Sequence, residues 1–485
     1  MQQVPDTMTA IERRASIGLA SIYGLRMLGL FIILPIFAIY AEHLPGGESH
    51  LLIGIALGAY GLTQAILQIP AGWMSDRYGR KPVIYVSLIL FAVGSFIAAY
   101  AGDIYWIIIG RVVQGAGALN AAVMALTADL TREEVRTKAM AMIGITIGIT
   151  FSISMVLSPL LAQMDFVIYL DIFRKEFHFI GVPGIFAMTG VLALLAMGVV
   201  KWVIPDPAIT RFHSDTEASW GHFGEVLRNK DLLRLDFGIF SLHAILMSVF
   251  MQVPFVMQKD GLELAHHWYI YLPVMLVAFG LMVPPIIIAE KKAKMKQIFM
   301  LSIFLAMCAQ ALLMFGQNSL WGVALALLIF FTAFNVLEAT LPSMISKIAP
   351  LAAKGTAMGV YSSVQFLGAF FGAAAGGALM QYVGGNSVFV FAIVLLLLWL
   401  IVASTMQPPA AVRTKLYHLT EMTNAQAAQL QQQLAQLQGV REAMVVAAEN
   451  IACLKVEMQG FDEAAVDKLV MAPPQPSPQV ERGQS

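Results

Sequence analysis

Cysteine and charge are both scarce in this chain of 485 residues, and each scarcity argues against a class of protein. The two cysteines, Cys308 and Cys453, lie far apart, which argues against a disulfide framework or a metal site. Only 12% of the residues are charged and 58% are hydrophobic, whereas soluble domains are about 25% charged. The formal net charge of zero argues against a nucleic-acid partner. The composition therefore indicates a protein built for a lipid bilayer.

Twelve apolar runs have roughly the 20 residues that a helix needs to cross a bilayer. The first run is too long for a cleavable signal peptide and lacks a small-residue cleavage site. The predicted spans are 16–40, 51–74, 83–101, 104–128, 138–162, 180–203, 234–257, 268–289, 297–316, 319–345, 355–381 and 387–406. The charged stretch at 163–180 predicts a longer loop between the fifth and sixth spans.

Lysine and arginine are concentrated in alternate loops. The loops around 13–14, 77–81, 132–138, 201–234, 291–296 and 347–354 are rich in these residues. The opposite loops carry only Arg174, Lys175 and Lys259. Because basic loops stay on the cytoplasmic side, this asymmetry predicts that both termini are cytoplasmic.

A polar stretch at 204–233 divides the chain into two predicted six-helix halves, 1–203 and 234–407. Matching positions recur about 215 residues apart: Arg26 with His243, Asp76 with Glu290, and Lys138 with Lys354. Such spacing favours a parallel internal repeat.

The composition changes after residue 407. Residues 412–470 follow the order strand, helix, strand, strand, helix, which predicts a small cytoplasmic α/β domain of ferredoxin-like type. Its partner is left open between a cytoplasmic ligand, the 204–233 linker and self-association. The domain distantly resembles heavy-metal-associated domains, which carry a Cys-x-x-Cys metal loop. That loop is absent here, so no metal is expected. The Pro/Gln-rich tail, 471–485, is predicted to be disordered.

The segment 72–81 is a charged, glycine-punctuated loop between two apolar runs: Gly72-Trp73-Met74-Ser75-Asp76-Arg77-Tyr78-Gly79-Arg80-Lys81. It resembles the signature loop between transmembrane helices 2 and 3 of major facilitator superfamily transporters. The resemblance implies a fold of 12 transmembrane helices in two halves and gating by Gly72, Asp76, Arg77, Gly79 and Arg80. It also implies a contact of Asp76 with Arg136, or of Asp129 with Arg77, that latches the cytoplasmic ends in the outward-facing state. The terminal domain resembles that of the YajR-like group within this superfamily.

Ionisable residues inside the spans cost at least a few kcal/mol and are functional candidates by default. Arg26 is assigned to proton coupling or substrate binding, with helix packing as the alternative. Arg111 lies in Gly110-Arg111-Val112-Val113-Gln114-Gly115, which resembles the family's fourth-helix motif, and the resemblance implies proton coupling. Glu338 and His243 are predicted to form a proton-sensitive pair, since burial favours the protonated form of a carboxyl group. Asn335, three residues before Glu338, shares its helical face and is a substrate-binding candidate.

Three further features are interpreted as structural. Gly144-x-x-x-Gly148 and the series Gly368, Gly372 and Gly376 predict close helix packing. Asp236 is predicted to lie at the membrane interface, near the end of the seventh span.

These features predict a proton-coupled secondary transporter of a bacterial inner membrane that exports a small, hydrophobic compound by alternating access. Ser158-Pro159 departs from the Gly-Pro motif that drug antiporters of the superfamily carry, which weakens the antiporter assignment. The alternatives are a proton symporter that imports a metabolite and a transporter-like membrane sensor that signals through its terminal domain. No nucleotide loop, metal cluster or catalytic constellation is recognisable, so neither an enzyme nor a cofactor is predicted. The expected partners are a small-molecule substrate, protons and the lipid bilayer.

Overall fold

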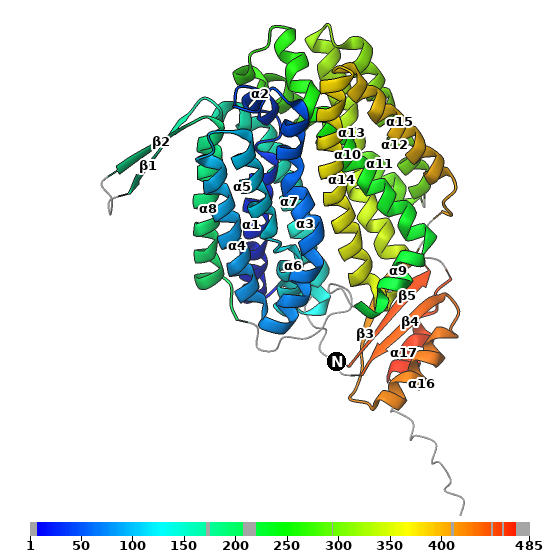
Figure 1. The fold of residues 1–485 in the computed structure, drawn as a ribbon. Coiled ribbons are helices and arrows are strands. Elements are labelled where there is room, and N and C mark those ends of the chain that lie inside the picture. Colours follow the sequence, from blue (N-terminus) through cyan, green and yellow to red (C-terminus); the bar gives the residue numbers. More distant parts are fainter. Residues whose placement is uncertain are drawn as a thin grey trace, which may run out of the picture.

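The computed structural model describes residues 7–170, 175–206, 220–292, 294–408, 412–447, 450–457 and 460–471. It contains a large helical body and a small α/β domain at one end of that body (Figure 1). We call the end that carries the small domain the domain end and the opposite end the far end. Residues 207–219 of the predicted linker and the predicted disordered tail from 472 onward lie outside the described residues.

Eight helices make up the first half. They are α1 (Ala10–Phe31), α2 (Phe37–Glu42), α3 (His50–Tyr78), α4 (Arg80–Ala99), α5 (Ile104–Ala116), α6 (Asn120–Asp129), α7 (Glu133–Leu161) and α8 (Val182–Trp202). The pairs α1–α2 and α5–α6 are each one predicted span, interrupted by a short non-helical segment.

The second half contains six long helices and a short one. They are α9 (Phe223–Arg228), α10 (Lys230–Lys259), α11 (Trp268–Lys291), α12 (Met295–Gly316), α13 (Leu320–Ile348), α14 (Lys354–Tyr382) and α15 (Asn386–Ser404). Single 3₁₀ turns are η1 (Trp220–His222), η2 (Leu264–His266) and η3 (Leu351–Ala353). Arg26 and His243 lie on the first long helix of each half, as the predicted repeat requires.

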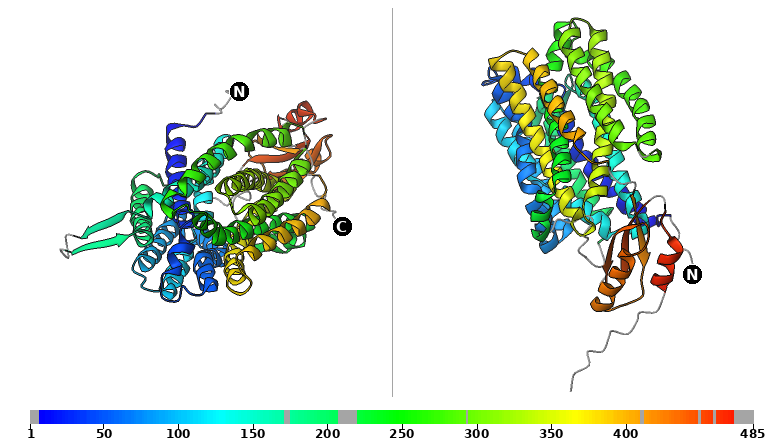
Figure 2. Two further views of the ribbon diagram at one scale, coloured as in Figure 1. Left: turned by 90° about the horizontal axis from the view of Figure 1, so that it is seen from above. Right: turned by 90° about the vertical axis from the view of Figure 1, so that its right-hand side faces the viewer.

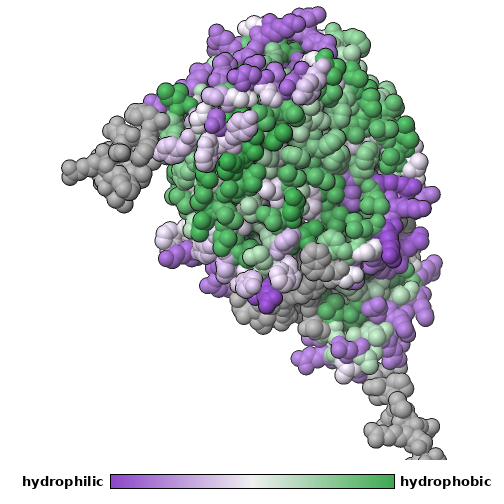
Figure 3. Space-filling model, viewed as in Figure 1, coloured by the Kyte–Doolittle hydropathy of each residue, from purple (hydrophilic) through white to green (hydrophobic). Residues whose placement is uncertain are grey.

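Eleven helical segments in the described ranges are long and apolar enough to cross a membrane, with α5 and α6 counted together. The predicted first span corresponds to α1 and α2, which the bend at 32–36 separates. Figure 3 shows a hydrophobic face over the helical body between more hydrophilic ends. Apolar side chains cover both the packed and the outer faces of these helices, as expected when the outer face meets lipid.

The stretch predicted as a long loop at 163–180 is instead an antiparallel hairpin. Its strands β1 (Asp165–Leu170) and β2 (Lys175–Ile180) pair from Asp165–Ile180 to Leu170–Lys175. The hairpin projects from the helical body at the far end (Figure 1). The prediction was wrong because it weighed charged residues above the β-branched and aromatic run 166–169, which favours a strand.

The small domain has the predicted order of strands and helices. It contains β3 (Val412–His418), α16 (Asn424–Ala435), β4 (Val440–Val446), β5 (Ile451–Glu457) and α17 (Glu463–Met471). The sheet order is β3-β5-β4 with both pairs antiparallel, which is the ferredoxin-like arrangement. Leu434, Leu454 and Val466 join the sheet to the two helices in one core. Figure 2 shows this domain lying against the domain end of the body.

The two halves meet along α3 and α14, toward the far end. A Cβ atom on Gly58 would lie 2.9 Å from the Phe370 Cα, and one on Gly61 would lie 2.7 Å from the Phe366 carbonyl oxygen. Beyond them, Ser49 Oγ donates a hydrogen bond of 2.9 Å to Gln381 Oε1. Glycine therefore brings two helix backbones into direct contact across the boundary between the halves.

The two glycine motifs differ in what they do. In α14, a Cβ on Gly368, Gly372 or Gly376 would clash with α10, so this series mediates helix packing as predicted. In α7, a Cβ on Gly144 would meet nothing within 4 Å, and one on Gly148 would lie 3.8 Å from the Phe279 ring. The predicted tight contact at Gly144-x-x-x-Gly148 is therefore absent.

Candidate functional site

Three helices of the second half bring polar side chains together midway along their length. Gln365 on α14 lies at the centre: its Nε2 is 3.2 Å from Glu338 Oε1 on α13 and 2.9 Å from His243 Nε2 on α10. His243 Nε2 is 3.9 Å from Glu338 Oε2. If the amide donates both hydrogen bonds, His243 accepts through Nε2 and carries its proton on Nδ1. The predicted pair of His243 and Glu338 is thus a triad with a neutral bridge.

Unsatisfied polar atoms surround this triad. Within the described part of the chain, Glu338 Oε2, Asn335 Nδ2 and Tyr361 Oη are buried without a hydrogen-bond partner. Leaving a buried polar group unpaired costs about 1–3 kcal/mol. Such a cluster indicates a place where a proton, a water molecule or a substrate completes the hydrogen bonds.

Aromatic rings connect this region to the first half. Phe151 on α7 stacks on Phe334 at 5.8 Å between ring centroids and meets Phe31 edge-on at 4.9 Å. Phe334 also lies 5.9 Å from the His243 ring. The polar triad therefore borders a buried aromatic cluster to which both halves contribute.

The first half has its own polar network, built around Arg26. The buried Arg26 guanidinium donates hydrogen bonds to Asn120 Oδ1 and Gln64 Oε1. Gln64 Nε2 continues the network to Gln68 Oε1 at 3.1 Å. In the described residues Arg26 forms no ion pair, and its hydrogen bonds go to neutral amide oxygens.

Arg111, on α5, is fully buried next to the Arg26 network. Its Nη1 donates to Gln114 Oε1 at 2.7 Å and its Nη2 to the Leu57 carbonyl oxygen at 3.2 Å. The Tyr60 ring lies 5.0 Å from the Arg111 guanidinium carbon and 5.6 Å from that of Arg26. Cation–π attraction thus joins the two arginines through one ring.

A second charged cluster occupies the domain end of the first half. Arg80 Nε donates to Asp129 Oδ2 at 3.1 Å, and Arg80 Nη1 donates to Asp76 Oδ1 and to Ser75 Oγ. The Arg80 and Asp129 side chains are 2% and 0% exposed, so this pair is buried. Arg80 ties the end of α3, the start of α4 and the end of α6 together.

The remaining predicted gating residues surround this cluster. The Arg77 guanidinium lies over the rings of Trp73 and Tyr78, so Arg80 forms the contact with Asp129 that the sequence assigned to Arg77. Gly79 alone separates α3 from α4 and has φ of +96°, a conformation that favours glycine. Gly72 lies where α3 approaches α6 closely, because a Cβ on it would lie 3.1 Å from the Ala121 Cβ. Arg136 is half-buried on the first turns of α7.

Glu12 forms another contact at the domain end, before the predicted first span. Its carboxylate accepts hydrogen bonds from the backbone N and the Nε of Arg132, at 2.9 and 2.8 Å. It also accepts from the backbone N of Thr9, completing a capping box for α1. The Arg132 side chain is the main reason that the pKa of Glu12 falls from 4.5 to about 2.

Asp236, predicted to lie at the membrane interface near the end of the seventh span, is buried within the protein. It is 5% exposed on α10, and its Oδ1 has no hydrogen-bond partner among the described residues. It is the seventh residue of α10, near the helix end where the sequence placed it, and its depth in the membrane stays a prediction.

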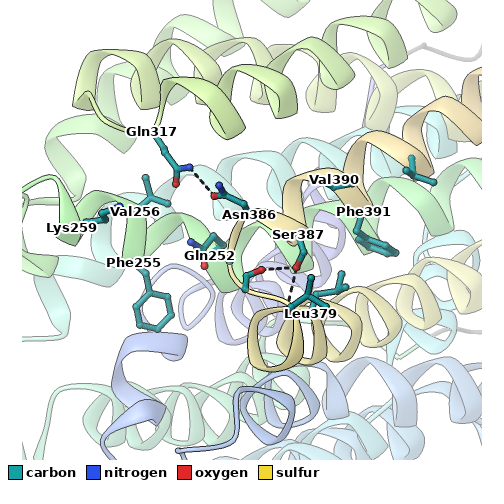
Figure 4. Close-up of a pocket in the computed structure, with 14 residues that line it drawn as sticks. Gln252, Phe255, Val256, Lys259, Gln317, Leu379, Asn386, Ser387, Val390 and Phe391 are labelled. Carbon is teal, nitrogen blue, oxygen red and sulfur yellow. Dashed lines mark hydrogen bonds between the residues drawn. The ribbon is translucent and has the colours of Figure 1, made fainter.

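A groove of about 1080 Å³ opens at the far end beside α10, α14 and α15 (Figure 4). Its polar lining includes Gln252, Lys259, Gln317 and Asn386, and Gln317 Nε2 donates to Asn386 Oδ1 at 2.7 Å. None of the predicted site residues lines it. We therefore locate the candidate site at Glu338, where the half-buried carboxylate meets the buried His243.

Sequence reasoning missed Gln365, Tyr60, Gln64 and Asn120. Gln365 stands alone in the apolar run from Val364 to Phe370, and the rule that drew attention to Glu338 applies equally to such an amide. Tyr60 carries no comparable signal, because an aromatic residue in a span is ordinary.

Two helical halves with buried polar networks define a multi-pass secondary transporter of the membrane. The family model of the Major Facilitator Superfamily matches residues 19–373 and 296–434. The chain therefore belongs to this superfamily.

Relatives extend the similarity over nearly the whole chain. The inner membrane transport protein YajR of Escherichia coli (strain K12) is 42% identical over 463 residues, covering 96% of this chain and 98% of that protein. The multidrug resistance protein MdtH of Aeromonas hydrophila is 25% identical over 360 residues, covering 73% of this chain and 85% of that protein. A solved bacterial homologue of the human lysosomal transporter Spinster, inward-facing and occupied, has a TM-score of 0.66 at 15% identity. It covers 82% of this chain and 97% of its own, and shares the fold.

Proposed function

We propose that this protein is a proton-coupled secondary transporter that exports a small, hydrophobic compound across the bacterial inner membrane by alternating access. The observation that carries the proposal is the position of Glu338. Its carboxyl group lies against the neutral side chain of Gln365 and beside His243, where a bound proton changes the charge of the whole triad.

The orientation of the charged loops supports cytoplasmic termini and a cytoplasmic terminal domain. With that orientation, the contact between α3 and α14 closes the periplasmic side and the described conformation is inward-facing. Protonation of Glu338 then shifts the balance between inward- and outward-facing states, because the two states solvate the carboxylate differently. Arg111 senses this change through Tyr60 and Arg26.

The buried aromatic cluster of Phe31, Phe151 and Phe334, which lies between the halves, supports a hydrophobic substrate. We assign Arg26 and Asn335 to polar contacts with that substrate. The name of the MdtH relative, a multidrug resistance protein, favours export. Import by proton symport uses the same acidic switch and differs only in the direction of coupling.

The Arg80 cluster supports a gating role at the domain end. Asp76, Arg80 and Asp129 hold α3, α4 and α6 as one unit, so that the first half moves as a rigid body. Gly72 and Gly79 permit the close helix approach and the tight turn that the cluster requires. We assign Arg77 and Arg136 to the same gating role, at the periphery of the Arg80 cluster.

The experiment uses purified protein in liposomes that contain a pH-sensitive dye, with a panel of lipophilic cations and small metabolites added outside. Antiport makes the interior more alkaline as substrate enters, whereas symport makes it more acidic. We expect alkalinisation in the wild type and its loss in Glu338→Gln. The control, Glu290→Gln, neutralises an exposed carboxylate at the end of α11 and is expected to behave like the wild type.

Proton movement that survives in Glu338→Gln refutes the assignment of Glu338 and retains the transporter. Acidification establishes the symporter alternative. A wild type that moves no proton with any compound supports the sensor alternative, which also predicts that removing residues 410–485 abolishes the cellular phenotype. Retained transport after that removal makes the domain an accessory.

A further inference from the structure

The small domain contacts the helical body at the connection between α13 and α14. Lys455 on β5 donates through Nζ to the Ala349 carbonyl oxygen, and Glu442 Oε1 on β4 accepts from the Leu351 backbone N at 2.8 Å. Lys455 Nζ and Glu442 Oε2 are themselves 3.2 Å apart. We call this set of four residues the interdomain contact.

The charges in the interdomain contact match the helix ends they touch. Ala349 is the C-cap of α13, where carbonyl groups lack partners and a cation is favoured. Leu351 begins η3, which leads directly into α14, and there a carboxylate is favoured. Lys455 thus neutralises the end of one helix and Glu442 the beginning of the next.

Burial distinguishes this contact from an ordinary surface ion pair. Lys455 is 5% exposed and Ala349 is 0% exposed. A lysine this deeply buried is costly unless its charge is paired, and both of its recorded partners belong to the interdomain contact. Exposed ion pairs, by comparison, contribute little to stability.

Two further hydrogen bonds hold the end of α15, from which the chain leads to the domain. Lys296 Nζ, on the first turn of α12, donates to the carbonyl oxygens of Ser404 and Met406 at 2.7 and 2.6 Å. These bonds hold the chain where it leaves α15 toward β3.

The interdomain contact lies on the helices that carry the triad. Glu338 is about three turns before Ala349 on α13, and Gln365 is about three turns after the start of α14. Helices transmit a shift of one end along their length, because packed side chains move as rigid units.

We propose that Lys455 and Glu442 are positioning residues for the transport site. Through the connection between α13 and α14 they set where Glu338 and Gln365 lie, so that the terminal domain controls proton coupling. The proposal rests on the proposed function and assigns the terminal domain a direct part in it. An event on the cytoplasmic side that breaks the hydrogen bond between Lys455 and Ala349 then frees α13 and α14 to move.

The test compares the full-length variants Lys455→Met and Glu442→Gln in the liposome assay. The control is Arg441→Met, which removes an exposed ion pair with Glu457, 2.6 Å away in the same sheet. We expect the first two variants to change the substrate KM, or the proton concentration for half-maximal flux, by about twofold to thirtyfold. Lys455→Arg keeps the donor and is expected to restore wild-type behaviour, whereas Arg441→Met leaves both quantities unchanged.

Amide hydrogen exchange provides a readout that does not depend on transport. We expect faster exchange at 349–365 in Lys455→Met and unchanged exchange there in Arg441→Met. The proposal is overturned if the Lys455→Met and Glu442→Gln proteins fold and both have the KM and pH profile of the wild type. A wild type that moves no proton refutes the proposed function instead, and unchanged exchange in Lys455→Met then refutes the interdomain proposal separately.

Discussion

Two glycines on different helices make a matched test of alternating access. A Cβ on Gly58 would lie 2.9 Å from the Phe370 Cα, in the other half of the protein. A Cβ on Gly376 would lie 2.9 Å from the Ser248 Cα, within the same half. The Ala variants therefore introduce the same overlap into two contacts that differ only in whether transport must open them.

The expected magnitude follows from the overlap. Ordinary contacts of a Cβ lie at 3.4–4 Å, so either alanine pushes a backbone away by about 0.5 Å or more, and such overpacking typically costs 1–3 kcal/mol. In Gly58→Ala the halves relieve the overlap by separating at the far end. A penalty of 1–3 kcal/mol on one of two states shifts their ratio by about 5- to 150-fold. In Gly376→Ala the overlap lies within the second half, so it is relieved only if α14 packs less tightly against α10.

The assay measures distances between spin labels across the far end. Cys308 and Cys453 are first replaced by serine, and labelled cysteines are then introduced at Tyr105 and Ser319, exposed positions in different halves. We expect Gly58→Ala to transfer population from the short to a longer distance with little change in Tm. We expect Gly376→Ala to lower the Tm with little change in the distances. Equal loss of Tm in both variants with unchanged distances refutes the reasoning.

Three further predictions concern stability in detergent. Arg80→Met deprives the buried Asp129 of its partner and is expected to cost about 3–5 kcal/mol, measured as a loss of Tm; a loss below 1 °C contradicts the buried-pair interpretation. Glu12→Gln removes a group whose pKa falls from 4.5 to about 2 beside Arg132. That carboxylate stabilises the fold above pH 4.5 and loses its contribution as the pH falls toward 2, so the Tm deficit of the variant is expected at pH 7 and absent near pH 2. Leu454→Ala opens the small core of the terminal domain and is expected to destabilise it by about 2–5 kcal/mol, detected as faster proteolysis of the domain while the helical body stays intact.

Much of the architecture was predictable because it depends on local properties of the chain. The length of an apolar run decides whether it crosses a bilayer, and all twelve predicted spans correspond to helices or interrupted helices. Alternation and turn residues likewise predicted the strand and helix order of 412–470. The hairpin at 165–180 was missed for a local reason as well, since its charged residues obscured a β-prone run.

The residues of the site were predictable only one at a time. Arg26, Arg111, His243 and Glu338 each attracted attention because a charge or titratable group in a span is costly. That argument names candidates but no partners. The family resemblance implied a contact of Asp129 with Arg77, but Arg80 makes it. Arg77 and Arg80 lie on either side of the break at Gly79, at the end of α3 and the start of α4, so helix packing decides which of them meets the carboxylate.

The sequence by itself determined the membrane class, the two-half organisation, the terminal domain and the candidate charges, because composition and periodicity are written along the chain. Only the tertiary structure decided that Gln365 joins His243 to Glu338, that Tyr60 lies between two arginines, and that Lys455 reaches the end of α13. Each of these contacts joins helices or domains that are distant in sequence. Their formation depends on packing between whole elements, which no local pattern records.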